Sequence, residues 1–336
     1  MKTYTVIYQT EKGPKTEFEF NFNEHVLFAG FNHQNIFDHN TFSSEVDEAI
    51  IVYSSNMAFI DKDFVKYISK ISCPVLLHCS NESLNHDTSY YRLAKAVLRS
   101  GGWNPNITKS NVFSVPLAFQ SEFFNAEQIP PETFGQRELI WCFFGSLKGD
   151  RQTMYSALSK LNPNYHFQSK DWMDKENKSP SEVIEYYKKT IFIPSPAGNI
   201  YFECNRTMDA LEWGCIPVSI RFLGEDCYKF LYGDHPFIIA DNWEEAALKM
   251  QELIDDPIKL NNKQQQVWNW YKLFKEELTR DVYLIIEGKQ HELKGKQFVY
   301  QRMARKNWRL RWSFFLHFTL KVYFRRLIRK LNFNTN

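Results

Sequence analysis

The stretch from 191 to 220 constrains the fold more than any other part of the chain. It begins with the apolar run Ile-Phe-Ile, continues through Pro-Ser-Pro-Ala-Gly-Asn into a polar segment, and ends in Gly214-Cys-Ile-Pro-Val-Ser-Ile. A short strand, a Pro/Gly loop, a helix and a second buried strand in this order predict a βαβ unit. Open α/β sheets bind ligands outside the carboxyl ends of their strands, so the loop after the first strand is a candidate binding site.

Two charged residues open the predicted helix of this unit. Arg206 and Asp209 are three positions apart, so they share one helix face. An arginine at a positive helix end suits a diphosphate, and a carboxylate one turn further can hold ribose hydroxyls. The alternative is a purely structural βαβ unit in which Asp209 is an ordinary surface carboxylate. Neighbouring residues that could contact the same ligand are Pro196, Gly198, Asn199, Glu203 and Asn205.

A second candidate phosphate loop lies about 50 residues earlier, in Phe143-Phe-Gly145-Ser146-Leu-Lys148-Gly-Asp-Arg151. Backbone N–H groups of a strand–glycine–helix turn, together with Lys148 and Arg151, can hold phosphate oxygens. The alternative is an ordinary turn, which any α/β domain contains. The spacing lacks the Gly-x-x-x-x-Gly-Lys-Ser/Thr pattern of a P-loop, which argues against an ATPase.

Strand-like and helix-like runs alternate along the chain, which predicts an α/β fold with parallel sheets. Expected strands are 49–53, 74–78, 111–115, 139–144 and 236–240, and expected helices are 61–71, 89–99, 151–161, 180–189, 242–255 and 258–271. The Pro-rich stretch near Pro130 interrupts the alternation. We therefore expect one Rossmann-like domain over 1–125, a linker over 126–138, a second domain over 139–290 and a tail over 291–336.

The motif Asn205-Arg206-x-x-Asp209-Ala-Leu-x-x-Gly214-Cys-Ile-Pro-Val resembles the donor-sugar segment of exostosin-like glycosyltransferases. The Phe-x-Gly145 loop with its following arginine is similar to the first strand–loop of their C-terminal domain, and the resemblance covers roughly 74–118 and 139–220. It implies a GT-B fold, with two Rossmann-like domains facing a cleft, and an inverting hexosyl- or pentosyltransferase. A nucleotide-sugar donor would bind without a metal or other cofactor, and Arg99 would help to hold its diphosphate.

Inverting sugar transfer needs a base for the acceptor hydroxyl. The expected strand 74–78 ends at His78 and is followed by Cys-Ser-Asn-Glu82 and, shortly after, Asp87. Glu82 is the first candidate base, with Asp87, His86 and His78 behind it. Exostosin-like enzymes often carry Asp-Glu where this chain has Asn81-Glu82. The alternative for Glu82 is an ordinary first-turn glutamate of a helix that Ser80 caps. The alternative for the whole chain is a nucleotide- or glycan-binding protein at a membrane, without catalysis.

Charge is distributed very unevenly along the chain. All 39 acidic residues lie at or before Glu292, while twelve of the 41 basic residues follow it. Aromatic residues accompany these cations, which predicts a helix lying in an anionic membrane surface over 296–330. A core-packed helix with a solvated basic face and a nucleic-acid arm are the alternatives, and the apolar run is too short to cross a bilayer, which needs about 20 residues.

Other features bear on location and metal binding. The six cysteines lack metal-site spacing and the chain starts with a strand-like run, which predicts a reduced, cytosol-facing protein. Together with the basic tail, this indicates a peripheral enzyme on the cytosolic face of a membrane. Its expected acceptor is a glycan or lipid-linked glycan in surface polysaccharide or lipopolysaccharide synthesis. We expect no nucleic-acid partner. Asp61-x-Asp63 could hold a metal, but two first-turn acids of a helix explain it better.

Overall fold

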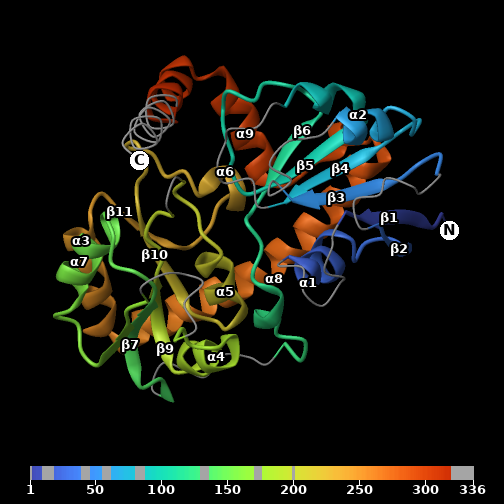
Figure 1. The fold of residues 1–336 in the computed structure, drawn as a ribbon. Coiled ribbons are helices and arrows are strands. Elements are labelled where there is room, and N and C mark those ends of the chain that lie inside the picture. The colour runs from blue at the N-terminus through green and yellow to red at the C-terminus, as the bar shows by residue number, and fades with distance from the viewer. Residues whose placement is uncertain are drawn as a thin grey trace, which may run out of the picture.

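The computed structural model describes residues 2–9, 19–38, 46–54, 62–79, 88–128, 136–169, 176–198 and 201–318. Two parallel sheets form its framework (Figure 1). The first has the order β2 (His33–Phe37), β1 (Tyr4–Tyr8), β3 (Ile50–Ser54), β4 (Val75–Cys79), β5 (Ala96–Ser100) and β6 (Val112–Val115). The second has the order β11 (Ile238–Ala240), β10 (Ile216–Ile220), β9 (Thr190–Pro194), β7 (Leu139–Phe144) and β8 (Asn164–Phe167).

The central strands are largely buried because helices or loops cover both faces of each sheet. All five residues of β4 and all five of β9 are buried. In both sheets the first strand lies between the second and the third, so the strand order reverses at β1/β3 and at β7/β9. Such reversals are the positions at which doubly wound sheets bind ligands.

Helices flank the sheets, and some of them begin with capping residues. Ser179 caps α4 in a capping box with Glu182, with Pro180 in the first turn, and the Asn242 side chain accepts a hydrogen bond from Glu245 N at the start of α7. The shorter helical elements and α-helices up to α7 are α1 (Phe20–Phe22), η2 (Asn23–Leu27), α2 (Lys62–Ile68), η3 (Ser89–Leu93), η4 (Ser121–Phe123), α3 (Asp150–Leu158), α4 (Pro180–Lys188), α5 (Arg206–Glu212), α6 (Lys229–Tyr232) and α7 (Trp243–Ile254).

The chain after α7 returns from the second sheet to the first (Figure 1). Helix α8 (Pro257–Glu287) reaches η2, where the Thr279 hydroxyl donates to Val26 O at 2.6 Å, and Glu287 accepts a hydrogen bond from the Tyr4 hydroxyl. After η6 (Gln290–Glu292), α9 (Lys296–Lys306) packs beside β6, where the Gln301 amide donates to Ser114 O at 2.7 Å. The larger of two apolar clusters consequently contains residues of both sheets and of these C-terminal helices.

The structure corrects one expected element. The predicted helix 89–99 is wrong, because residues 89–93 form a single 3-10 segment and 96–100 form β5 between β4 and β6. A short apolar run such as Ala-Val-Leu fits either a buried strand or a buried helix, and sheet pairing decides it here. Strands β2 and β8 were not predicted, and α8 runs well beyond Tyr271. None of the six cysteines is in a disulfide.

Replacing Lys275 with Met should destabilise the connection between α8 and the second domain. Lys275 Nζ lies 3.2 Å from Glu212 Oε1, and the Glu212 side chain is 1% exposed. Removing the cation leaves a buried carboxylate without its ionic partner, so we expect the free energy of unfolding to fall by about 3 kcal/mol. Urea unfolding at slightly alkaline pH measures this loss.

Lys259 on the same helix is the matched control for Lys275. It forms a surface ion pair with Asp256 at 3.1 Å and is 73% exposed. Lys259→Met should change the free energy of unfolding by less than about 1 kcal/mol. Equal effects of the two substitutions would show that the buried pair does not stabilise this junction.

Candidate functional site

The carboxyl ends of β7 and β9 bring together two loops that are distant in sequence. Arg206, at the start of α5, donates from Nη2 to Phe144 O at 3.2 Å, and its guanidinium lies 4.6 Å from the centre of the Phe143 ring. Arg206 Nη1 also lies 3.2 Å from Cys204 Sγ. These contacts hold the half-buried guanidinium at the β7/β9 reversal, where the fold favours ligand binding.

A second arginine lies on the other side of the same loop. Arg151 Nη1 is 3.4 Å from both the carbonyl and the hydroxyl oxygen of Ser146. Gly145 has a φ of +149°, and a Cβ added there would lie 3.3 Å from the Phe143 ring and 3.6 Å from Arg151 Nη1. Any other residue at 145 would be strained at this φ and would crowd the Phe143 ring. Lys148 is an exposed third cation on the loop.

The loop after β9 is fixed beside this group by Asp150. Its carboxylate accepts hydrogen bonds from Ala197 N at 3.2 Å and from Trp243 Nε1 at 2.7 Å. Pro196 and Gly198 therefore lie next to the start of α3, while Asn199 lies outside the described residues. The structure thus places Gly145, Ser146, Lys148, Arg151, Pro196, Gly198 and Arg206 around the ends of two neighbouring strands.

The predicted acidic residues of the same segment point elsewhere. Glu203 is fully buried and accepts from Leu117 N and from the Tyr232 hydroxyl, both at 2.9 Å. Asp209 is 2% exposed and accepts from Gln120 N at 2.9 Å and from the Gln120 amide group at 3.1 Å. These carboxylates anchor the chain that leaves the first sheet, and their contact with a sugar or ribose stays a prediction.

Two more residues of this segment contact the same connecting chain. The Asn205 side-chain amide donates to Ala118 O at 2.7 Å, and the Asn125 amide donates to Glu212 O at 3.2 Å. Segment 117–125 therefore lies along α5, because each of the two donates one hydrogen bond to the other. Sequence patterns did not indicate this role, because its partners are about 90 positions apart.

The candidate base region is described only in part. His78 lies at the end of β4, fully buried, with Nδ1 2.6 Å from the Tyr91 hydroxyl and its ring stacked on Tyr53 at 4.6 Å. Arg99 is 1% exposed on β5, not at the end of the predicted helix 89–99, and donates to Gly102 O at 2.9 Å. Its contact with a diphosphate stays a prediction. Glu82, His86 and Asp87 lie outside the described residues.

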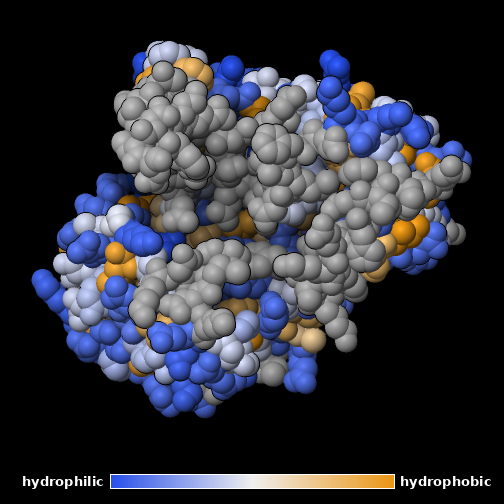
Figure 2. Space-filling view, in the orientation of Figure 1, coloured by the Kyte–Doolittle hydropathy of each residue, from blue (hydrophilic) through white to orange (hydrophobic). Residues whose placement is uncertain are grey.

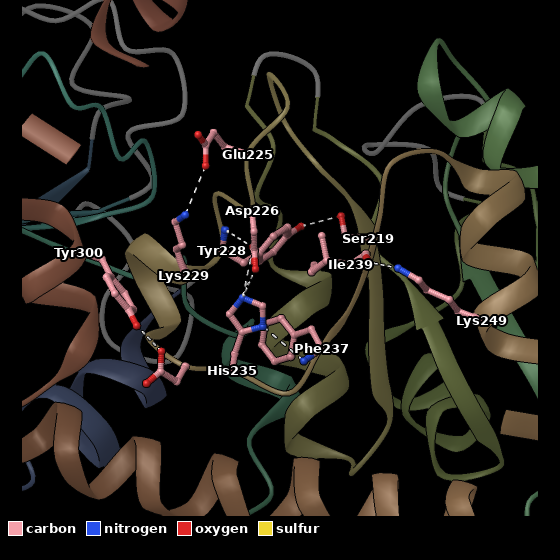
Figure 3. Close-up of polar contacts among 11 residues, drawn as sticks. Ser219, Glu225, Asp226, Tyr228, Lys229, His235, Phe237, Ile239, Lys249 and Tyr300 are labelled. Carbon is pink, nitrogen blue, oxygen red and sulfur yellow. Dashed lines mark hydrogen bonds and ion pairs between the residues drawn. The ribbon is translucent and has the colours of Figure 1, made fainter. Parts of the chain in front are cut away.

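Sequence reasoning missed a group of polar side chains that supports the loop after β9 (Figure 3). The Ser219 hydroxyl oxygen, at the end of β10, is 2.8 Å from Ser195 O and 3.2 Å from the Tyr228 hydroxyl. The Tyr228 hydroxyl is also 3.2 Å from Phe202 O, and Tyr228 N donates to Asp226 at 3.1 Å. Asp226 in turn faces His235 Nε2 at 3.3 Å. No motif marks these residues, because their contacts come from tertiary packing alone.

Potential metal ligands are not grouped in the described part of the chain. Across the described ranges, no set of three or more His, Cys, Asp or Glu side chains is arranged to hold a metal ion. Asp63 lies in the first turn of α2, as the helix interpretation expects, and Asp61 is outside the described residues.

Comparisons with known proteins place the fold. No model of a protein family matches the sequence, and no curated protein matches it. Among solved structures, T4 phage BGT in complex with UDP-glucose is similar, with a TM-score of 0.50 and 15% identity over 85% of this chain and 99% of that one. An α1,3-fucosyltransferase also matches, with a TM-score of 0.48 and 10% identity over 84% and 92% of the two chains. With its two parallel Rossmann-like sheets, the chain has the GT-B fold.

Burial makes Asp209 a source of pH-dependent stability. Loss of solvent raises its pKa from 3.8 to about 7, against the opposing effect of the two hydrogen bonds from Gln120. Between pH 3.8 and about 7, Asp209 keeps its proton in the folded protein but loses it in the unfolded chain. The stability contribution is therefore full at low pH and declines as pH rises through this window, by at most about 1.4 kcal/mol per pH unit.

Asp209→Asn should remove this dependence while keeping an oxygen that accepts from Gln120 N. We expect the wild type to lose stability relative to the variant as pH rises from about 4 to about 7. Urea unfolding at several pH values in this range tests the expectation. Wild-type and variant curves that run parallel would show that Asp209 does not titrate there.

Proposed function

We propose that the chain is a glycosyltransferase that uses a nucleotide-sugar donor. The observation that carries this proposal is the group of cations at the β7/β9 reversal of a GT-B fold. Arg206 and Arg151 approach the same loop, and Lys148 extends from it. Two acids among the described residues lie near them: Asp150, whose two oxygens already accept hydrogen bonds, and Asp209, whose pKa is raised by burial to about 7. The local charge therefore favours an anion.

A sugar diphosphate suits this group chemically. Arginine forks and loop N–H groups bind phosphate oxygens with charge-assisted hydrogen bonds. When the bond between the sugar and the diphosphate breaks, negative charge grows on the departing phosphate, and cations fixed beforehand stabilise that charge. We propose that Arg206, Arg151 and Lys148 supply this stabilisation, so transfer would not depend on a divalent metal. Unchanged turnover after chelation would agree with this.

The finer parts of the proposal concern mechanism, acceptor and location. We propose inversion at the anomeric carbon, with Glu82 as the first candidate base and Asp87 and His78 as the others. The acceptor would be a glycan or lipid-linked glycan of surface polysaccharide or lipopolysaccharide synthesis, on the cytosolic face of a membrane. The motif around Arg206 supports kinship with exostosin-like enzymes.

A thermal-shift series with UDP-, GDP-, CMP- and dTDP-linked sugars tests the donor site. A ligand that binds only the folded state raises stability, so one nucleotide class at saturation should raise the Tm by on the order of 5 °C. Arg206→Ala and Lys148→Ala should reduce the shift strongly. Arg206→Lys keeps the charge but loses the two-pronged hydrogen bonding, so its shift should be intermediate.

Lys189→Ala is the matched control, because Lys189 lies at the opposite end of β9 in a surface ion pair with Glu138. Its shift should equal that of the wild type. Absence of any shift with all four donor classes would contradict the donor site. A donor that binds but never loses its sugar, with water or with glycan acceptors, would favour a nucleotide- or glycan-binding protein without catalysis.

A further inference from the structure

The end of the described chain forms a helix that is apolar on two opposite sides. Residues 308–318 are helical, and Leu310, Phe314 and Phe318 are at most 5% exposed. The Phe314 ring lies 5.2 Å from that of Trp103 and 5.7 Å from that of Phe222. These contacts attach one side of the helix to both domains, because Trp103 follows β5 and Phe222 follows β10. The core-packed alternative is therefore correct for this side.

The opposite side is exposed. We call Trp308, Trp312, Phe315 and Leu316 the outer aromatic face, and their exposed fractions are 69%, 54%, 47% and 38%. They follow helical spacing, and the rings of Trp312 and Phe315 stack with their centres 5.5 Å apart. In Figure 2 this end of the molecule, at the upper left, carries pale and orange side chains beside blue ones. A helix with a second apolar side is expected to be covered on that side as well.

This exposure is unusual within the molecule. In the described part of the chain, Trp308 and Trp312 are the two tryptophans among the exposed large hydrophobic side chains, whereas Trp103, Trp141 and Trp243 are at most 2% exposed. Of the exposed large hydrophobic side chains in the described ranges, half lie between Met303 and Leu316. Single exposed apolar residues need no explanation, but a contiguous group marks an interaction surface.

The charge around the outer aromatic face is entirely positive along this stretch. No acidic residue follows Glu292 in the sequence. Arg302, Lys306 and Arg309 are exposed, and the Arg309 guanidinium lies 5.7 Å from the Trp308 ring centre. Arg305 and Arg311 instead bind the first domain, through Val112 O and the Asn106 side chain. Arg309 thus borders the aromatic side chains, and Arg302 and Lys306 shortly precede them on α9.

We propose that the outer aromatic face docks on an anionic lipid bilayer. Tryptophan and phenylalanine partition into the interface between headgroups and acyl chains, while bordering arginine and lysine side chains contact lipid phosphates. Among the described residues, none of the helices has the length and apolar character of a membrane span. Nucleic acids also bind cations and aromatic rings, but Leu316 and Met303 offer them no hydrogen bonds, whereas both suit acyl chains. This docking does not depend on the proposed transfer activity.

Vesicle sedimentation of the full chain tests the docking surface. We expect strong binding to phosphatidylcholine vesicles that contain about one-third phosphatidylglycerol, at least tenfold weaker binding to pure phosphatidylcholine, and weakening by salt. The double variant Trp308→Ser and Trp312→Ser should bind the anionic vesicles at least tenfold more weakly. So should Arg302→Glu with Arg309→Glu. An unchanged thermal unfolding profile would show that each variant is folded.

The matched control is Leu248→Ser with Ile258→Ser, two side chains that are 65% and 74% exposed on α7 and α8. This variant should bind the vesicles like the wild type. Wild-type binding by the tryptophan variant would overturn the proposal and assign membrane contact to other residues. Two other results would also overturn it: binding to a single-stranded oligonucleotide but not to vesicles, or tryptophan-dependent dimers that do not bind vesicles. Each of these results leaves the thermal-shift test of the donor site unaffected.

Discussion

Three buried carboxylates between 203 and 212 hold the two sheets in a fixed relation. Glu203 and Asp209 accept the backbone N–H groups of Leu117 and Gln120, and Glu212 pairs with Tyr271 and Lys275 of α8. A carboxylate without water is stable only while its hydrogen bonds persist. Neither the chain leaving the first sheet nor α8 can move away without exposing or orphaning one of these groups. The contacts of α8 with η2 and of α9 with β6 add to this constraint.

The same short segment divides its polar residues between two tasks. Its acids face the interdomain junction, while Arg206 reaches the end of β7 and meets the loop that carries Arg151. The carboxylates therefore fix the position of α5, and α5 fixes the arginine. This explains how a helix of only seven residues can hold a guanidinium steadily at the reversal of the strand order. It also explains why Asp209 is buried although Arg206 is only half-buried.

Local patterns predicted much of this fold. The runs that became β3, β4, β7 and β9 are apolar and short, and the caps of α4 and α7 have their own sequence signatures. The run Ala-Val-Leu-Arg-Ser was misassigned because its period is ambiguous until β4 and β6 pair with it. The Gln120–Asp209 contact joins positions 89 apart, so only the folded chain reveals it. Arg206 could be named as a candidate because its motif is local, whereas Asp150 and Tyr228 act through packing.

Hydrogen–deuterium exchange with and without nucleoside diphosphates tests the central claim most directly. If Arg206 and Arg151 hold a diphosphate at the β7/β9 reversal, one of UDP, GDP, CDP or dTDP should slow amide exchange in segments 144–151 and 201–210. The wild type should show this protection and Arg206→Ala should lose it. Protection restricted to another surface would contradict the account, for example to the groove lined by His25, Phe124 and Lys272 beside α8. Arg206, Arg151 and Lys148 would then not form the binding site of a nucleotide-sugar donor.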